Sequence, residues 1–330
     1  MYIDEPLHTL DIVIDEDTDN AILRANKNEF LGRGTKEYIL SYRNETLSNR
    51  GYIVPEDWDY EWNVHLGPVW TPDVLGSTKV VSWISPEYLK LKTGSTTLLA
   101  QASDRSGNDN HFDGPTGKEP SLSTTKLNYM SGIDFDGSDD FMWSEDGDYG
   151  KWFEPGTGDF VVAFVINTGT DQNNTPIIAA MGGGGVGADE WSVQIINSSS
   201  DANYTHTCDN DVNTQAGWAA SQNAILVVSR TSGTNDIRLN GTSLGTATTA
   251  DAVTDNTGRG IYIGCFLNSG NTAEDHHWDG IMYEALWVDA SQTTAEIQKI
   301  EGYLAHKFKL TGNLPAAHSY KSDPPRRDVV

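Results

Sequence analysis

The stretch that decides the fold is residues 278–310, which read WDGIMYEALWVDASQTTAEIQKIEGYLAHKFKL. Residues 281–288 are almost entirely apolar or aromatic and contain no proline, which predicts a strand covered on both faces. A helix is predicted to follow, because Thr293 and Glu296 have the spacing of a capping box. Its apolar residues then recur on a single stripe, which we expect to pack on the sheet: Ile297, Ile300, Leu304 and Phe308.

The end of this helix is also marked in the sequence. Lys307 and Lys309 lie in the expected last turn, where the helix dipole favours cations. Gly312 follows, and we expect it to end the helix.

Three segments resemble laminin-G/concanavalin A-like domains, in the branch common in phage structural proteins and marine bacterial surface proteins. They are residues 295–307 with Leu314-Pro315 and Tyr320-Lys321 after them, residues 104–111 (DRSGNDNH), and residues 132–142 (GIDFDGSDDFM). Residues 104–111 match the family turn D-x-S-G-N-G-N-H, except that Asp109 replaces a glycine. Ser319 follows His318 where the family has proline.

The resemblance covers roughly residues 69–321 and implies an all-β fold, an antiparallel jelly-roll β-sandwich of concanavalin A type with a C-terminal helix. Residues 132–142 would form a hairpin around a polar turn, with Ile133, Phe135 and Phe141 pointing inward. Asn240-Gly241 is a second hairpin signal. Further strands are predicted at residues 80–84, 160–166, 176–180, 191–196, 224–229, 237–239 and 261–266.

Residues 1–68 differ from the rest, and residues 322–330 form a short tail. Leu10, Ile12 and Ile14 alternate with other residues and predict a strand, whereas Thr18 or Asp19 could cap a helix over residues 21–31 that ends at Gly32 and Gly34. No periodic pattern here is long enough for a core, so we expect an anchoring arm or small subdomain; the alternative is an arm that folds back on its own domain. The apolar residues expected to contact a partner are Ile12, Ile14, Ile22, Leu23, Phe30, Leu31, Tyr38 and Ile39.

Composition limits the partners. The 330 residues carry 22 Lys and Arg against 47 Asp and Glu, a net charge of −25, which repels nucleic acid and anionic membranes. No run has transmembrane length and no signal peptide is evident, so we expect synthesis and assembly in a cytoplasm. Two cysteines, Cys208 and Cys265, are too few for a disulfide scaffold and are expected to be buried thiols.

Several motifs that could carry enzymatic chemistry fail on their context. Gly182, Gly184 and Gly187 fit G-x-G-x-x-G, but a predicted strand follows where a dinucleotide site needs a helix. Asp15, Asp17 and Asp19 start like an EF-hand loop that then lacks its glycine and glutamate. Asp57, Asp59 and Glu61 alternate like a glucanase acid motif, yet they precede the sandwich. We therefore expect no catalytic residues.

Two candidate binding sites remain. Asp136, Asp139 and Asp140 share one turn, and Asp209 and Asp211 lie in another predicted loop. Members of the family often bind Ca²⁺ in such turns; the alternative is that these carboxylates are only solvated. His276-His277 lack a third zinc ligand and are expected to be structural.

Trp143, Trp152 and Trp218 lie near predicted loops and could stack on sugars, whereas Trp191, Trp278 and Trp287 are expected in the core.

The resemblance implies a non-enzymatic phage virion structural protein, either a capsid decoration or a fibre-associated protein. Residues 1–68 would contact other capsid or tail proteins, and the sandwich would be displayed on the virion surface after assembly in the host cytoplasm. The alternative is a carbohydrate-binding adhesion module for host or algal polysaccharide, and the two can coexist. A glycoside hydrolase would need a paired-carboxylate cleft that the sequence does not show. We expect no cofactor other than Ca²⁺, and a homo-oligomer is an alternative to a virion partner.

Overall fold

The computed structural model describes residues 10–15, 20–25, 29–35, 69–144, 152–170, 177–181, 191–198, 201–208, 211–253, 260–267 and 274–327. The chain divides into two compact units. The first comprises Met1–Val69 with Arg326–Val330, and the second comprises Trp70–Pro325.

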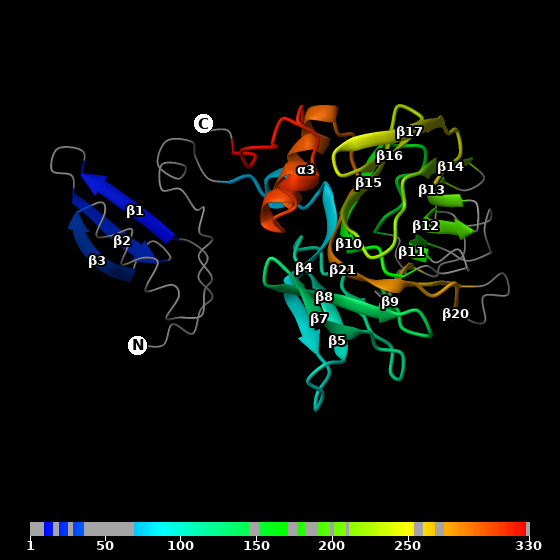
Figure 1. Ribbon diagram of the computed structural model, residues 1–330, viewed down its shortest axis with the longest axis horizontal. Helices are drawn as coiled ribbons and strands as arrows, with labels where there is room; N and C mark the ends of the chain where they lie inside the picture. Colours follow the sequence, from blue (N-terminus) through cyan, green and yellow to red (C-terminus); the bar gives the residue numbers. More distant parts are fainter. Residues whose placement is uncertain are drawn as a thin grey trace. The chain divides into compact units, whose positions relative to one another are not determined.

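The described part of the first unit is a three-stranded antiparallel sheet in the order β1-β2-β3 (Figure 1). Its strands are β1 (Leu10–Asp15), β2 (Asn20–Ala25) and β3 (Glu29–Thr35). The predicted strand at Leu10, Ile12 and Ile14 is confirmed. Of the residues expected to contact a partner, Ile12 and Ile14 lie on β1, and the strands β2 and β3 carry Ile22, Leu23, Phe30 and Leu31.

The helix predicted over residues 21–31 is wrong, because β2 and β3 occupy that segment. Ile12 of β1 pairs with Leu23 of β2, and Leu23 also pairs with Gly32 of β3, so β2 has a neighbouring strand on each side. Gly32 and Gly34 lie within β3 and do not end a helix. Hydrogen bonds between neighbouring strands satisfy the backbone N–H and C=O groups of this segment. A helix would instead have needed a cap at Thr18 or Asp19 for its first N–H groups.

The second unit contains one extended antiparallel sheet, and its sixteen strands within the described residues confirm the all-β class. Along the sheet they run β14-β13-β12-β11-β18-β9-β6-β5-β4-β21-β10-β15-β16-β17, with β8 paired to β21 and β7 to β8. Strands β4 to β10 are β4 (Val80–Leu91), β5 (Leu99–Asp104), β6 (Phe112–Asp113), β7 (Ser121–Leu127), β8 (Met130–Asp136), β9 (Met142–Trp143) and β10 (Phe160–Asn167). Strands β11 to β15 are β11 (Ile177–Met181), β12 (Trp191–Ser198), β13 (Asp201–Cys208), β14 (Asp211–Ala216) and β15 (Asn223–Thr231). The others are β16 (Thr234–Leu239), β17 (Thr242–Thr248), β18 (Ile261–Ile263) and β21 (Asp279–Val288), and a separate pair is formed by β19 (Phe266–Leu267) and β20 (Glu274–Asp275).

This sheet folds back on itself into a sandwich, and its two ends meet. The side chain of Asn213 on β14 donates to the backbone oxygen of Gly245 on β17 at 3.2 Å. The main core lies between the layers and joins Phe164 and Leu226 of β10 and β15 to Trp191 and Ile263 of β12 and β18. Burial of these large side chains is the main stabilising term of the sandwich.

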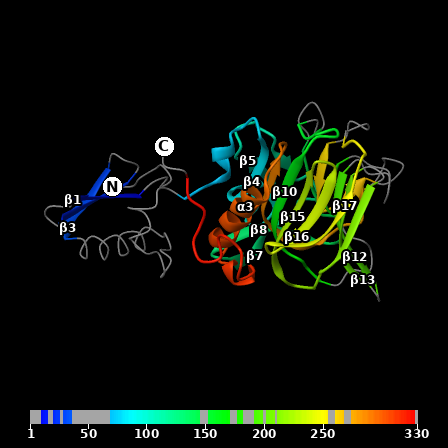
Figure 2. The ribbon, with the colours of Figure 1, turned by 90° about the horizontal axis from the view of Figure 1, so that it is seen from above.

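A second core lies between the sheet and the helix α3 (Thr294–Lys307), which covers the outer side of β10 and β15 (Figure 2). Strand β21 contributes to both cores, as predicted for a strand covered on both faces. Met282, Ala285 and Trp287 belong to the main core. The residues of β21 on the helix side are Ile281, Tyr283, Leu286 and Val288.

The helix begins as predicted and ends differently. Thr293 and Glu296 form the capping box, and the stripe Ile297, Ile300, Leu304 and Phe308 is buried. The helix ends at Lys307, before the expected stop: Gly312 lies in the 3-10 helix η2 (Thr311–Asn313). Lys309 takes the left-handed conformation (φ 55°), and the Leu310 N–H donates to the Ala305 oxygen at 2.7 Å, a Schellman ending without glycine. A second 3-10 helix, η1 (Pro72–Leu75), precedes β4.

Two buried carboxylates tie α3 to the sheet. A β-bulge at Tyr283 places Glu284 on the helix side of β21, where its Oε1 accepts from Trp83 Nε1 (2.8 Å) and the Tyr303 hydroxyl (2.9 Å). Lys307 Nζ lies 2.6 Å from Glu284 Oε2. Burial and the Glu284 charge hold the pKa of Tyr303 well above its usual value, so the phenol stays a donor.

The second carboxylate, Glu301, is fully buried and accepts two hydrogen bonds from Arg238 on β16, at 2.7 and 3.1 Å. His318 Nε2 lies 3.1 Å from Glu301 Oε2, the oxygen that also accepts from Arg238 Nη2. Burial by itself would lower the pKa of Arg238, but the hydrogen bonds and charge of Glu301 raise it above its usual value. This pair joins the helix, β16 and the segment after the helix.

The predicted hairpin of residues 132–142 is wrong in its pairing. Ile133, Phe135 and Phe141 are buried as expected, but β8 pairs with β7 and β21, whereas β9 pairs with β18 and β6. The turn after Asp136 therefore carries the chain from one part of the sheet to another. Phe141 packs in a small separate cluster with Tyr262 and Cys265.

The segment of residues 104–111 fastens the start of β4. Asp104 accepts from the Trp83 N–H (2.8 Å), and Asn108 and Asn110 donate to the backbone oxygens of Val80 and Val81 at 2.8 and 2.6 Å. These are structural contacts that close a turn. Asp109, the residue that departs from the family motif, is in the left-handed conformation with φ 60°.

Replacing Asp109 with glycine should stabilise the protein by up to about 1 kcal/mol, because glycine adopts this backbone conformation without a Cβ penalty. Urea unfolding of the two proteins measures the difference. Asp323→Gly, at an exposed residue outside the left-handed region, is the matched control and should be neutral or slightly destabilising. A loss of stability on Asp109→Gly would show that the carboxylate has a structural role.

Cys208 and Cys265 are buried thiols, as predicted. In the part of the chain that the structure describes, no helix is both long enough and apolar enough to cross a membrane.

Candidate functional site

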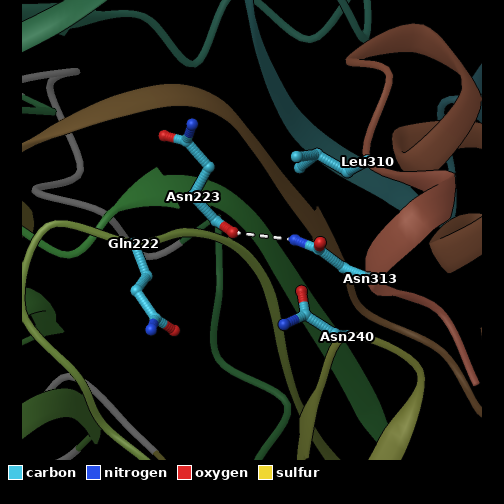
Figure 3. Close-up of a pocket in the computed structure, with 5 residues that line it drawn as sticks. All are labelled: Gln222, Asn223, Asn240, Leu310 and Asn313. Carbon is cyan, nitrogen blue, oxygen red and sulfur yellow. Dashed lines mark hydrogen bonds between the residues drawn. The ribbon is translucent and has the colours of Figure 1, made fainter.

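An open cleft of about 460 Å³ lies where the end of α3 meets the start of β15 and the β16–β17 turn (Figure 3). Four residues with amide side chains and one apolar residue line it: Gln222, Asn223, Asn240, Asn313 and Leu310. None of the five carries a charge, although the chain as a whole has a net charge of −25. Amides donate and accept hydrogen bonds equally well, which suits neutral polar ligands.

The β16–β17 turn places Asn240 in the cleft. Asn240 and Gly241 both have positive φ, 50° and 83°, so the predicted Asn-Gly hairpin is confirmed as a type I′ turn. The Asn240 N–H donates to the Ile225 oxygen (2.8 Å), and its Oδ1 accepts from the Ile225 N–H (2.9 Å). A Cβ on Gly241 would lie 2.8 Å from His318 and 3.1 Å from Leu314, so the turn also packs closely on the segment after the helix.

The 3-10 helix η2 places Asn313 on the other side of the cleft. Its Nδ2 donates to the backbone oxygen of Asn223 at 3.0 Å (Figure 3). Lys321 stabilises η2, because its Nζ donates to the oxygens of Thr311, Gly312 and Leu314 at 2.6, 3.0 and 2.8 Å. Asn313 is thereby held on a fixed turn.

The three aspartates of the predicted metal site lie close together. One carboxylate oxygen from each of Asp136, Asp139 and Asp140 lies within 4.8 Å of the others. Asp140 is half-buried, and its burial together with the charge of Asp136 raises its pKa to about 7. Asp134 nearby also has a raised pKa, from burial and from Asp279 and Asp136. Burial and the neighbouring carboxylates therefore oppose the ionisation of Asp134 and Asp140.

The three candidate tryptophans differ in their exposure. Trp218 is 9% exposed and belongs to the main core, so the expectation that it lies open to a sugar is wrong. Trp152 is partly buried, its Nε1 donates to Ser144 Oγ (2.9 Å), and its ring meets Phe112 and Trp287 edge to face. The side chain of Trp143 is half-buried beside Phe141 and Tyr262. Trp191, Trp278 and Trp287 are fully buried, as predicted.

The strand β12 presents a polar strip on the side away from the main core. Trp191 and Val193 belong to that core, so Ser192, Gln194 and the cross-strand partner of Ser192, Thr207 on β13, lie on the opposite face. All three are buried, and within the described residues their side-chain polar atoms lack hydrogen-bond partners. A bound water or ligand group would supply them.

Several motifs weighed in the sequence, and two of the predicted interface residues, fall outside the described residues. These are the glycines Gly182, Gly184 and Gly187, the acids Asp17, Asp19, Asp57, Asp59, Glu61 and Asp209, and the interface residues Tyr38 and Ile39. His276 and His277 lie between β20 and β21, in the loop expected from the sequence.

No pattern in the sequence indicated the amide cleft. Its residues come from three segments around positions 222, 240 and 313, and asparagines in turns are common for reasons of backbone conformation alone. The Asn240-Gly241 signal predicted the turn, but it did not predict what the turn would face.

No protein-family model matches this chain, and no curated protein matches it. Among solved structures, a mutant of Trypanosoma rangeli sialidase displaying trans-sialidase activity is similar at 12% identity and TM-score 0.48, over 90% of this chain and 44% of that chain. A botulinum neurotoxin type C structure, described as dependent on two ganglioside molecules for cell entry, has 14% identity and TM-score 0.45 over 70% and 52%. The binding domain of Paraclostridial Mosquitocidal Protein 1 has 8% identity and TM-score 0.46 over 68% and 52%. The chain thus spans about half or less of these structures, and similarity this low says nothing about function.

Proposed function

We propose that the sandwich is a non-enzymatic carbohydrate-binding module that holds its ligand in the amide cleft. The observation that carries this proposal is an open cleft lined by four amide-bearing residues and by no charged residue. Sugars present hydroxyls that both donate and accept, and the amides complement them.

The test is a glycan array with the full-length protein, followed by calorimetric titration of the glycans that bind. Gln222→Ala and Asn313→Ala should each weaken binding, because both side chains line the cleft and both residues are exposed. Gln298→Ala, on the helix surface outside the cleft, is the matched control. If none of the glycans binds, the proposal is wrong.

The carboxylates of the aspartate turn support the non-enzymatic part of the proposal. Most glycosidases use two carboxyl groups about 5–9.5 Å apart, one on each side of the scissile bond. Carboxylate oxygens of Asp136, Asp139 and Asp140 instead lie within 4.8 Å of one another in a single turn. Measurable turnover of any bound glycan, lost on mutation of a carboxylate, would refute this part.

We also propose that the aspartate turn binds Ca²⁺, because three convergent carboxylate oxygens match its preferred ligands. Asp140→Asn should raise Tm at pH 8 in chelator and leave it unchanged near pH 4. A raised folded-state pKa favours folding below the unfolded pKa, and this advantage is lost as pH rises through about 7. Added Ca²⁺ at pH 8 should raise Tm of the natural protein and not of the variant. If Ca²⁺ stabilises both equally, it binds elsewhere.

The N-terminal unit is proposed to attach this module to a larger assembly, with a phage virion as the expected setting. The support is the resemblance of residues 104–111, 132–142 and 295–307 to phage surface domains, and the separation of Met1–Val69 from Trp70–Pro325. A chain starting at Gly67 should remain folded and fail to join the particle. Normal incorporation of this truncated chain would exclude the anchoring role, and sedimentation of the isolated protein would show whether the unit joins copies of this chain instead.

A further inference from the structure

The two asparagines of the cleft are oriented in opposite senses by their own hydrogen bonds. Asn240 uses its Oδ1 to accept from the Ile225 N–H at 2.9 Å, so its Nδ2 remains a donor. Asn313 uses its Nδ2 to donate to the Asn223 oxygen at 3.0 Å, so its Oδ1 remains an acceptor. Within the described residues, no side-chain or backbone group occupies either remaining atom.

The backbone groups that hold Asn240 and Asn313 lie on the same strand, β15. Asn223 and Ile225 are two residues apart on β15, which corresponds to about 6.6 Å along a strand. The donor and the acceptor therefore line one cleft at a spacing set by the strand, and Figure 3 shows both side chains beside the same space. Because both amides are fixed before a ligand arrives, little side-chain entropy is lost on binding.

The charges around the cleft argue against an anionic ligand. None of the five lining residues is charged. Lys321, on the neighbouring segment, donates to three backbone oxygens and so has its donors committed to η2. A sialate, uronate or sulfate would meet no guanidinium or ammonium donor in the lining, and it would approach a protein with a net charge of −25.

We infer that the cleft recognises a neutral sugar through two of its hydroxyl groups, one accepting from Asn240 Nδ2 and the other donating to Asn313 Oδ1. Gln222, which is exposed, adds an adaptable amide at the rim. This inference rests on the proposed carbohydrate-binding function and states its ligand class.

The experiment titrates the full-length protein with three neutral polysaccharides (a β-glucan, a mannan and a galactan) and three anionic glycans (alginate, heparin and sialyllactose). At least one neutral glycan should bind and the anionic glycans should not. The decisive variant is Asn240→Asp, which keeps the acceptor for Ile225 and the left-handed turn but replaces the Nδ2 donor with oxygen. It should weaken neutral-glycan affinity by roughly tenfold or more, the size expected for one lost hydrogen bond in a preorganised site.

Gln298→Glu adds the same charge on the helix surface and should leave affinity unchanged. Tm of each variant shows whether the fold is intact, and Gln222→Ala serves as a second cleft variant in which no structural hydrogen bond of a side chain is lost. Preference for anionic glycans would overturn this inference while leaving carbohydrate binding in place. Neutral-glycan binding that is insensitive to both cleft variants would place the site elsewhere. Absence of binding to all six would overturn the proposed function together with this inference.

Discussion

Replacing Arg238 with methionine should lower the free energy of unfolding by about 3–5 kcal/mol, because it leaves the fully buried carboxylate of Glu301 without its cation. Two charge-assisted hydrogen bonds, at 2.7 and 3.1 Å, are lost in the same step. Urea unfolding followed by tryptophan fluorescence and circular dichroism measures the change. The free energy of unfolding of Arg238→Lys should lie between those of the natural protein and Arg238→Met, because a single ammonium cannot reproduce the paired contact.

The control for this prediction is the double variant Arg238→Met/Glu301→Gln. It should be more stable than Arg238→Met, because a neutral amide costs less to bury than a carboxylate without a cation. A single-variant cost below about 1 kcal/mol would mean that the pair behaves like an exposed salt bridge. Arg238 also donates to the Gly241 oxygen at 2.9 Å, so its loss should weaken glycan binding through the neighbouring Asn240.

The second large effect is acid destabilisation through His206. This residue is fully buried on β13, beside Phe160 and Trp191, and burial followed by the charge of Arg230 lowers its pKa to about 3. The unfolded chain takes up this proton near pH 6.5, while the folded chain does not. The contribution of His206 to the free energy of unfolding is therefore fully present above about pH 6.5. It is lost as the pH drops towards 3, and the loss from this residue is roughly 4–5 kcal/mol.

The measurement is the free energy of unfolding of the natural protein and of His206→Gln between pH 7 and pH 3. His206→Gln should be less stable at pH 7, because the aromatic contacts are lost, and its stability should fall less steeply with acid. Subtraction of the two profiles removes the contribution of carboxylates such as Glu119 and Glu296, whose lowered pKa values act in both proteins. Parallel profiles would show that the pKa of His206 is the same in the folded and unfolded chains, which would contradict this prediction.

The buried ion pair of Arg238 and Glu301 also supports the proposed binding site. Arg238 and Glu301 join the helix to the β16–β17 turn, and that turn and η2 hold the two asparagines of the cleft. Side chains on strand ends and short turns bind precisely only when buried contacts hold those turns in place. The cleft thus depends on a buried ion pair whose members do not line it.

Local patterns in the sequence predicted much of the fold. The capping box at Thr293, the apolar stripe of the helix and the Asn240-Gly241 turn are all present, because each depends on interactions between residues close in sequence. The helix predicted over residues 21–31 and the hairpin of residues 132–142 were wrong for the opposite reason. Each depends on which distant strand pairs with the segment, and β1 and β21 decided that pairing.

The candidate site was less predictable than the fold. The aspartates of residues 136–140 converge because they share one turn, and this the sequence could show. Glu284 within an apolar strand and Glu301 within the helix had no local signal, since their partners Lys307 and Arg238 lie 23 and 63 residues away. Elements whose stability comes from neighbours along the chain could be inferred from local patterns. The amide cleft and the buried ion pairs could not, because their residues come from separate segments and meet only when the sheet folds back and the helix packs on it.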